Sequence, residues 1–392
     1  MYYKIIGFFC VFQVYQITAQ SVKKTMLRLP DTGESTSYTN TFGEDHDYLV
    51  NSPYFILHGN GTVTDTITGL TWQQTDGGEM TIENAIIYCD TLTLGGYSNW
   101  RLPDAQEAFS ILNMQNVNPA IDTKVFTKTA AEYWWTSESQ VNDATKIWAT
   151  NAGGGIGNHP KAETISAGGS KKFHVRAVRD NNAPATIPNH YTDNGDGTIT
   201  DNLTNLVWQK TPSTSIFTWE QALNNAESLS FAGDNDWRVP NIKELQSIND
   251  ETTVNPSVNT AFFGSIGVKH YWSSTTLPNQ TTKAWYWNTQ FGITTYDTKT
   301  NSNYLLCVRG NSINTSLNSY DTIISNLKVY PNPFSSYIYV VNNQEVVALY
   351  DGLGQLIYSG NNIKEQDFSN LKCGVYFLRE QGKSGAIKIV KN

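Results

Sequence analysis

One stretch of the sequence occurs twice, and this repetition limits the folds that the chain can adopt. Residues 61–72 read GTVTDTITGLTW, and residues 197–208 read GTITDNLTNLVW. A period of roughly 136 residues is longer than the unit of a solenoid and close to the size of one small domain. The sequence therefore predicts two tandem copies of one domain.

Further matches extend the two copies downstream in the same order. Residues 99–103 (NWRLP) return as 236–240 (DWRVP), and 133–137 (YWWTS) return as 271–274 (YWSS). Each copy also ends on a strand-like segment that closes with Val-Arg. The polar run between the copies contains two prolines, and we expect it to be a semi-rigid spacer.

Each copy begins with the pattern of a β-hairpin that is followed by two helices. Thr81 and Thr218 are start signals for the first helix, and Asp104 and Asn241 for the second. At Thr218, Asp104 and Asn241 a Gln or Glu three residues later completes a capping box. Alternating strand-like runs and loops follow in each copy. This order predicts an α+β domain.

The N-terminus has the pattern of a secretory signal peptide. Lys4 precedes a mostly apolar run that is too short to span a bilayer as a helix, and Ala19 offers a cleavage site. No later apolar run is long enough for a transmembrane helix. We therefore expect export of the chain after removal of residues 1–19, followed by a leading segment over residues 20–52.

The charge distribution argues against nucleic acid as a partner. Residues 21–322 carry 19 Lys and Arg against 30 Asp and Glu, which gives a net charge of −11. Phosphate recognition requires a basic patch, so an acidic surface of this kind disfavours nucleic acid and other polyanions. All eleven tryptophans lie between residues 72 and 287, within the two copies.

The C-terminal part of the chain has a different pattern. After a Ser/Asn-rich linker at 311–322, residues 323–392 contain short alternating runs that are separated by Gly turns, as in a small β-sandwich. The motifs VYPNPF at 329–334, LYDGLGQ at 349–355 and GVYF at 374–377 resemble the type IX secretion sorting domain. That resemblance implies an immunoglobulin-like sandwich, recognition by the type IX secretion machinery, and a secreted or outer-membrane-surface protein after removal of this domain.

Each copy resembles the Lcl C-terminal domain family, which is named for the tail of a bacterial collagen-like adhesin. The signature is the GT-TD hairpin, the Trp-Arg-hydrophobic-Pro block, the aromatic Tyr-Trp segment and the closing Val-Arg. The resemblance implies two tandem C-type-lectin-like domains, with a hairpin that joins the chain ends and loops that present the ligand site.

The cysteines depart from the family pattern, in which a helix cysteine is bridged to one in the closing strand. Cys89 is opposite Ala177 in the first copy, and Cys307 is opposite Ala226 in the second. One interpretation is two lost bridges that leave buried thiols. The other is a Cys89–Cys307 bridge between strand-swapped copies.

The candidate ligand contacts are aromatic and polar residues in the second half of each copy, where the copies differ. They are Trp285, Tyr286, Trp287, Asn288 and Tyr296 in the second copy, and Trp148, Asn151 and His159 in the first. Alternation on a strand places Trp285 and Trp287 on one face and Tyr286 and Asn288 on the other, so one pair belongs to the core. Aromatic rings and amides suit a neutral sugar.

The residues that both copies share are interpreted as structural, with each arginine bonding backbone carbonyls. They are Asp65, Trp72, Trp100, Arg101 and Pro103 in the first copy, and Asp201, Trp208, Trp237, Arg238 and Pro240 in the second.

Metal and catalytic motifs are not apparent. The six histidines are scattered, and Asp193–Gly197 is better explained as a hairpin turn than as a calcium loop, because Gly195 interrupts the alternating ligand positions. We find no nucleophile with an adjacent base and no paired carboxylates, and we expect no cofactor.

These observations predict a non-enzymatic, secreted or surface-displayed protein of the adhesin type that binds a glycan or an extracellular protein. The alternatives are a structural or protein-interaction module and, third, a secreted enzyme. The predicted domains are 1–19, 20–52, 53–180, 189–310, 311–322 and 323–392.

Overall fold

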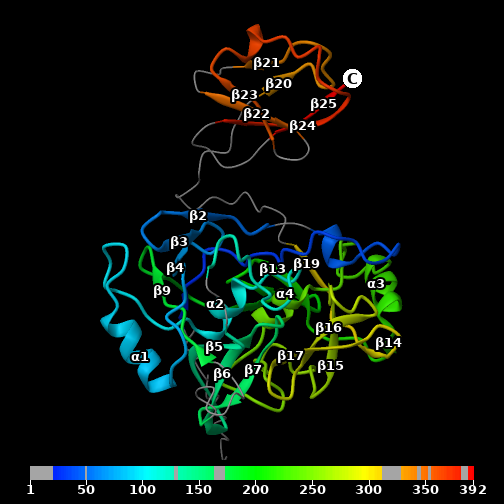
Figure 1. Cartoon of the computed structure of the whole chain (residues 1–392). Helices are drawn as coiled ribbons and strands as arrows, with labels where there is room; N and C mark the ends of the chain where they lie inside the picture. Colours follow the sequence, from blue (N-terminus) through cyan, green and yellow to red (C-terminus); the bar gives the residue numbers. More distant parts are fainter. Residues whose placement is uncertain are drawn as a thin grey trace, which may run out of the picture. The chain divides into compact units, whose positions relative to one another are not determined.

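The computed structural model describes residues 21–48, 51–127, 131–162, 173–310, 328–341, 346–351, 355–380 and 387–392 (Figure 1). The predicted signal peptide and the linker at 311–322 lie outside the described residues. The chain divides into two compact units at residues 312 and 313, so both copies belong to the first unit. Within the described ranges, no helix has the length and apolar character needed to cross a membrane.

The two copies contain equivalent elements in the same order, and the second has one further short strand, β14, before its first helix. The first copy contains β2 (Phe55–Leu57), β3 (Thr62–Asp65), β4 (Leu70–Gln73), α1 (Ile82–Thr91), α2 (Ala105–Ser110), β5 (Tyr133–Gln140), β6 (Asp143–Asn151), β7 (Ile156–Pro160), β8 (Phe173–His174) and β9 (Val178–Asp180). The second contains β11 (Tyr191–Asp193), β12 (Thr198–Asp201), β13 (Leu206–Gln209), β14 (Ile216–Phe217), α3 (Trp219–Glu227), α4 (Ile242–Ser247), β15 (His270–Thr276), β16 (Lys283–Asn288), β17 (Ile293–Thr298), β18 (Asn303–Tyr304) and β19 (Val308–Gly310).

Each copy is built on two sheets. One sheet holds the repeated hairpin and the closing strand, in the order β2-β3-β4-β9 in the first copy and β11-β12-β13-β19 in the second. The other sheet has the order β7-β6-β5-β8 in the first copy and β14-β18-β15-β16-β17 in the second. The repeated hairpin therefore pairs the start of each copy with its end, through Trp72 opposite Val178 and Trp208 opposite Val308.

The expected α+β class with C-type-lectin-like domains is wrong. The described part of the chain is mostly β-sheet, and its four α-helices have only 10, 6, 9 and 6 residues. The predicted start signals are correct, because capping boxes occur at Asp104, Thr218 and Asn241. Each helix has fewer than three turns, however, because the apolar stripe after each start signal is short. Much of the sequence that we expected in loops forms strands.

The Trp-Arg-hydrophobic-Pro block joins the second helix of each copy to the closing strand. Arg101 forms two short hydrogen bonds to the Glu107 carboxylate (2.6 and 2.7 Å), and Arg238 does the same with Glu244 (both 2.6 Å). Each glutamate is also the capping-box residue of its helix. We expected each arginine to bond backbone carbonyls, but its main partner is the carboxylate of a glutamate. A bidentate carboxylate binds a guanidinium group more strongly than a carbonyl does.

The two copies pack directly on each other, although we expected a spacer to separate them. One hydrophobic cluster contains Phe109 and Trp148 from the first copy with Leu245 and Trp285 from the second. Gln106 on α2 donates to the Gln246 carbonyl near the end of α4 (2.7 Å). A second polar contact links the same two helices, with the donor on α4 and the acceptor on α2.

Lys243 on α4 supplies this second contact. Its ammonium group donates to the Ser110 carbonyl at the end of α2 (2.7 Å) and to the Asp31 carbonyl (2.8 Å). The side chain is 1% exposed, and burial lowers its pKa to about 8. The interface between the copies therefore has approximate twofold symmetry around α2 and α4.

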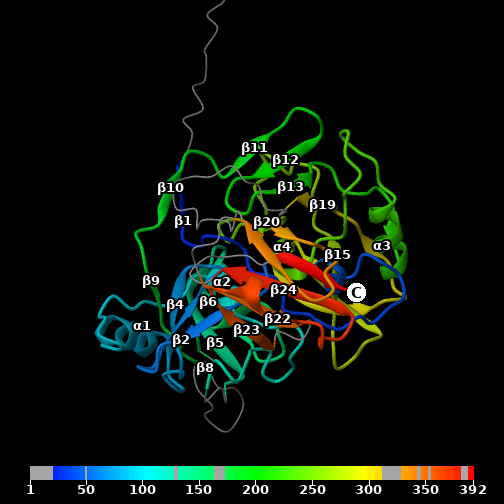
Figure 2. The same ribbon diagram turned by 90° about the horizontal axis from the view of Figure 1, so that it is seen from above.

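The leading segment packs mainly on the second copy, and the linker between the copies pairs with it. Strand β1 (Val22–Lys24) forms a two-stranded sheet with β10 (Ala185–Ile187), as Figure 2 shows. The two tyrosines of the leading segment, Tyr38 and Tyr48, contact different copies. Tyr38 accepts from Gln115 of the first copy, whereas Tyr48 donates to Glu227 of α3 and its ring lies tilted against that of Phe42.

Buried carboxyl groups fix the leading segment on β15. Asp45 is 1% exposed and accepts from the hydroxyls of Thr32 (2.8 Å) and Thr275 (2.5 Å). Glu34 is fully buried and accepts from the Thr276 backbone amide (3.2 Å). Burial, with the nearby Asp31 carboxylate, raises the pKa of Asp45 to about 8. The Asp45 carboxyl is therefore largely protonated in the folded protein at neutral pH.

The described part of the second unit consists of strands and one short 3₁₀ helix (Ile363–Glu365). Its strands are β20 (Lys328–Tyr330), β21 (Tyr339–Val341), β22 (Val347–Asp351), β23 (Leu356–Gly360), β24 (Gly374–Glu380) and β25 (Ile387–Lys391). They form a two-stranded sheet and a four-stranded sheet of order β23-β22-β24-β25. One core contains Phe334, Leu349, Leu378 and Ile389. This unit has its own hydrophobic core, as a separate domain requires.

Among the described residues, Cys89 and Cys307 are free thiols that are each 1% exposed and belong to different hydrophobic clusters. Burial raises the pKa of Cys89 to about 12, so its thiolate is scarce at neutral pH. The structure therefore matches the interpretation of two unbridged, buried cysteines.

Thiol accessibility tests this arrangement. We expect an alkylating reagent to modify exposed Cys373 in the native protein within minutes and to leave Cys89 and Cys307 unmodified, because reaction requires an accessible thiolate. All three should react in denaturant without a reductant. Peptide mass spectrometry measures both states, and a Cys89–Cys307 disulfide in the unreduced protein would contradict the fold.

The buried Asp45 predicts a pH dependence of stability. Its folded-state pKa is raised, so its stabilising contribution is complete below the unfolded-state pKa and is lost as the pH rises through about 8. Asp45→Asn keeps an acceptor oxygen for Thr32 and Thr275 but does not titrate. The fall in melting temperature between roughly pH 5 and pH 9 should therefore be several degrees smaller in this variant.

Differential scanning calorimetry at each pH measures this difference. Asp47→Asn, at an exposed neighbouring position, is the control and should keep the wild-type dependence. An Asp45→Asn variant whose melting temperature follows pH as steeply as the wild type would show that Asp45 does not hold a proton in the folded state.

Candidate ligand-binding cleft between the two copies

The outer strands of the two larger sheets meet where the copies join. Strand β7 is the edge strand in the first copy, and β17 is the edge strand in the second. The Ile156 backbone amide on β7 donates to the Thr294 hydroxyl on β17 (2.9 Å), and Ile156 is buried. The side chain of Ile293 lies against Gly157, where a Cβ atom would be 3.6 Å from it. The two edge strands thus form one continuous surface from separate copies.

A cleft of about 310 Å³ opens along this junction. Its lining comes from β5, β6 and β7 of the first copy and from β17 and the turn before it in the second. The lining residues are Gln140, Lys146, Asn151, Ile156, Gly157, Asn158, His159, Phe291, Ile293, Thr294 and Thr295. This volume is at the lower end of the range for small-molecule sites. Both copies are needed to form the cleft.

Asn158 is the most informative residue in the cleft. Both polar atoms of its side-chain amide are buried, and neither has a hydrogen-bond partner among the described residues. A buried amide without partners costs about 1–3 kcal/mol, so such groups are rare in folded proteins unless water or a ligand satisfies them. Register places Asn158 opposite Trp148 on the neighbouring strand. The amide can donate to and accept from a polar ligand at the same point.

The electrostatic character of the cleft is nearly neutral. The described lining residues include the cation Lys146 and the imidazole of His159, together with amides, hydroxyls and apolar groups, and none is Asp or Glu. Lys146 is also 3.4 Å from Asp143, which offsets its charge. The His159 ring packs against Tyr133, with ring centroids 4.3 Å apart. The cleft therefore offers hydrogen bonds and apolar contact rather than a strong field.

The structure places the predicted tryptophans in the core. Trp148, Trp285 and Trp287 are 2%, 3% and 0% exposed, and all three belong to the hydrophobic cluster that spans both copies. Trp285 and Trp287 are therefore the buried pair of the two that alternate on β16. Tyr286 is half-buried on the other face of that strand, beside His270.

Asn151 and Asn288 occupy equivalent positions at the ends of β6 and β16. The Asn151 side-chain oxygen accepts from the Gly153 and Gly155 amides (2.9 and 3.2 Å), and that of Asn288 accepts from the Gln290 amide (2.9 Å). Both oxygens are therefore used to hold a turn. Asn151 also lines the cleft with His159, whereas Asn288 does not.

Tyr296 is the most exposed of the predicted aromatic residues, at 41%. It lies on β17, the strand that also carries Thr294 and Thr295, and its ring contacts Trp285 edge-on. Lys283 lies over the same ring, 4.9 Å from its centroid. The structure thus brings Asn151 and His159 together in the cleft, whereas Tyr296 lies on the lining strand β17 but outside the lining itself.

Sequence reasoning missed Gln140, Lys146, Asn158, Phe291, Thr294 and Thr295. These are common surface residues with no motif of their own. The available signal was a polar Asn in a short strand beside the Gly-rich turn at 153–155. The importance of this Asn becomes evident only in the tertiary structure, where the edge strand of the second copy lies beside it.

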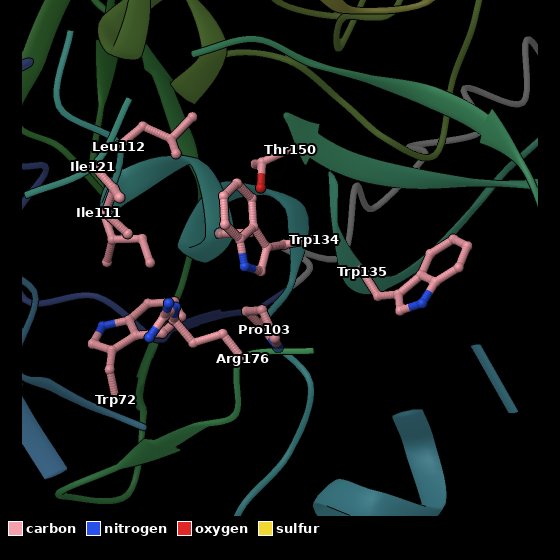
Figure 3. A pocket seen from close by; sticks show the side chains of 10 residues that line it. Trp72, Pro103, Ile111, Leu112, Ile121, Trp134, Trp135, Thr150 and Arg176 are labelled. Atoms are coloured by element: carbon pink, nitrogen blue, oxygen red, sulfur yellow. The ribbon is translucent and has the colours of Figure 1, made fainter. Parts of the chain in front are cut away.

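A smaller cavity inside the first copy does not suit a polymer. Figure 3 shows its lining, which includes Trp72, Trp134 and Arg176. Its volume is about 10 Å³, room for roughly one water molecule. The Arg176 guanidinium donates to the Gln73 and Gln74 carbonyls (2.8 and 2.6 Å), and burial lowers its pKa to about 10.

The shared residues have structural contacts. Trp72, Trp100, Trp208 and Trp237 are buried. The Asp65 carboxylate accepts from the Ile67 and Thr68 amides of its own turn, and that of Asp201 accepts from the Leu203 amide and the Thr204 hydroxyl. The Pro103 and Pro240 carbonyls accept from strand amides. In the described ranges, no three His, Cys, Asp or Glu side chains are grouped to hold a metal ion.

Comparison with known families gives two matches. The Lcl C-terminal domain matches residues 61–179 and again 197–309, which together are more than half of the chain. The chain belongs to the Lcl C-terminal domain family. The secretion system C-terminal sorting domain matches residues 328–392. No curated protein and no solved structure matches the chain.

These family assignments establish the location of the protein. The type IX sorting domain shows that it is secreted or displayed at the cell surface and handled by the type IX secretion machinery. Neither matched family is a catalytic one.

Proposed function

We propose that this protein is a non-enzymatic binding protein of the adhesin type, which holds a neutral glycan segment in the cleft between its two copies. The observation that carries the proposal is the Asn158 amide, whose two polar atoms are buried without partners at the cleft. A sugar hydroxyl can both donate and accept, so it can satisfy both atoms.

The rest of the cleft supports a sugar over a charged ligand. The hydroxyls of Thr294 and Thr295, the amides of Gln140 and Asn151, and the ring of Phe291 provide polar contacts beside an apolar face. Pyranose rings have the same combination of polar edge and apolar face. The acidic character of the two copies disfavours sulfated polysaccharides.

The proposed site is a single composite one that both copies form together. Because β7 and β17 come from different copies, a single copy would present only half of the lining. The duplication then has a function that one domain cannot perform. The third possibility, enzymatic turnover, lacks a nucleophile-and-base pair among the described residues that line the cleft.

A glycan array probed with the full chain, followed by titration of the best ligand, tests the proposal. We expect Asn158→Ala to weaken binding by about tenfold or more, because the ligand loses two hydrogen bonds. The melting temperature should stay unchanged or rise, because the variant removes a buried amide that has no partner in the folded protein. A destabilised variant with unchanged affinity would show that Asn158 has a structural role only.

Asn84→Ala on α1 is the matched control, because Asn84 is exposed and lies outside the cleft. It should bind like the wild type. Absence of binding to any glycan, together with saturable binding to an extracellular protein that Asn158→Ala does not change, would contradict the proposal and favour a protein-interaction module.

A further inference from the structure

The leading segment lies along helix α3 of the second copy and contacts two glutamates on one face of that helix. The Thr39 hydroxyl donates to the Glu220 carboxylate (2.7 Å), and the Tyr48 hydroxyl donates to the Glu227 carboxylate (2.7 Å). Gly43 lies so close to Glu227 that a Cβ atom there would be 2.8 Å from the carboxylate. Residues 39–48 therefore run along α3 and bind it through two hydroxyl groups.

Leu223 lies between these two glutamates on the same face of α3. Positions 220, 223 and 227 are three and four residues apart, so they form one stripe on the helix surface. Leu223 is 0% exposed and belongs to the core of the second copy. The stripe thus combines two carboxylate acceptors with a covered apolar residue.

Helix α1 of the first copy carries the same stripe. Aligning the helix starts at Thr81 and Thr218 makes Glu83, Ile86 and Asp90 the equivalents of Glu220, Leu223 and Glu227. The residue types are the same in kind: acid, aliphatic, acid. The chemical pattern that binds the leading segment is therefore present twice.

The stripe on α1 is exposed. Ile86 is 48% exposed and the adjacent Ile87 is 59% exposed, while Glu83 and Asp90 also face solvent. In Figure 1 the dark-blue leading segment runs beside α3, and α1 lies at the opposite side of the unit. One leading segment cannot cover two helices that lie on opposite sides. Paired exposed isoleucines between two carboxylates are thus left on the first copy.

We propose that the α1 stripe of Glu83, Ile86, Ile87 and Asp90 is a docking surface for an extended segment of a partner protein. The segment resembles residues 36–48 of this chain in its chemistry. It presents a Ser or Thr hydroxyl and a Tyr hydroxyl that bind the two carboxylates, with a small residue between them that allows close approach to the helix. We take these features from Thr39, Gly43 and Tyr48 of the leading segment, which contact the equivalent residues of α3.

This inference goes beyond the proposed glycan site and is independent of it. The cleft is lined by β5, β6, β7, β17 and the turn before β17, and no residue of α1 lines it. Loss of one activity therefore leaves the other intact. Together they give the protein one surface for a glycan and one for a protein.

The test uses a fluorescently labelled peptide of residues 36–48 as the probe and residues 21–392 as the protein. We expect saturable binding by fluorescence anisotropy. Ile86→Lys should weaken it at least tenfold, because a charge then occupies the position whose equivalent in the second copy, Leu223, is fully buried. Since Ile86 is half exposed, the variant should fold, which its circular dichroism and melting temperature check.

Two controls make the result specific. Asn84→Lys adds the same charge to α1 outside the stripe, about 100° around the helix from Glu83, and should weaken peptide binding much less than Ile86→Lys does. A peptide with Thr39→Val and Tyr48→Phe lacks both hydroxyls and should bind at least tenfold more weakly to the wild type, because the carboxylates lose their donors.

Three results would overturn the proposal. The first is no saturable binding up to the solubility limit of the peptide. The second is binding that Ile86→Lys leaves unchanged, which would mean that the peptide exchanges with the leading segment on α3. The third is a concentration-dependent dimer in analytical ultracentrifugation that Ile86→Lys abolishes, which would assign the surface to a second copy of the chain.

Discussion

The packing of α2 against α4 is the interaction on which the rest of the first unit depends. It places Trp148 of one copy and Trp285 of the other in a single hydrophobic cluster. It is fixed by reciprocal polar contacts from Gln106 and Lys243 to the ends of the opposite helices. Burying a lysine ammonium group is costly, and two backbone carbonyls compensate for it. Because this interface exists, β7 and β17 meet and a cleft forms between them.

Approximate symmetry makes the differences between the copies informative. Each copy has the same bidentate Arg–Glu pair, the same repeated hairpin and the same helix caps, so these features serve the fold. The leading segment breaks the symmetry, because one chain has one N-terminus and covers α3 alone. The stripe on α1 is exposed although its equivalent on α3 is covered, so it is a place where the two copies differ. The composite cleft needs both copies, so it is a place where the duplication is required.

The candidate site could be predicted only in part. The sequence favoured the variable second half of each copy, and Asn151 and His159 do line the cleft. The tryptophans were predicted as ligand contacts but belong to the core, because large aromatic residues occur both in ligand-binding surfaces and in β-rich cores. Alternation on a strand shows that two residues share a face, but it does not show which face is buried. Asn158 carried only the weak signal of a polar residue in a short strand, since a strand of the other copy completes the cleft that it lines.

The sequence by itself determined the duplication, the helix starts and the secretion sorting domain. These features depend on local signals, such as capping residues, turn dipeptides and alternating runs, which act over a few residues. Only the tertiary structure decided the fold class, the packing of the copies, the course of the leading segment and the identity of the buried faces. These depend on contacts between residues more than a hundred positions apart, such as Gln106 with Gln246 and Thr39 with Glu220. Local residue patterns do not encode which distant surfaces meet, because many apolar faces are chemically equivalent until the chain packs.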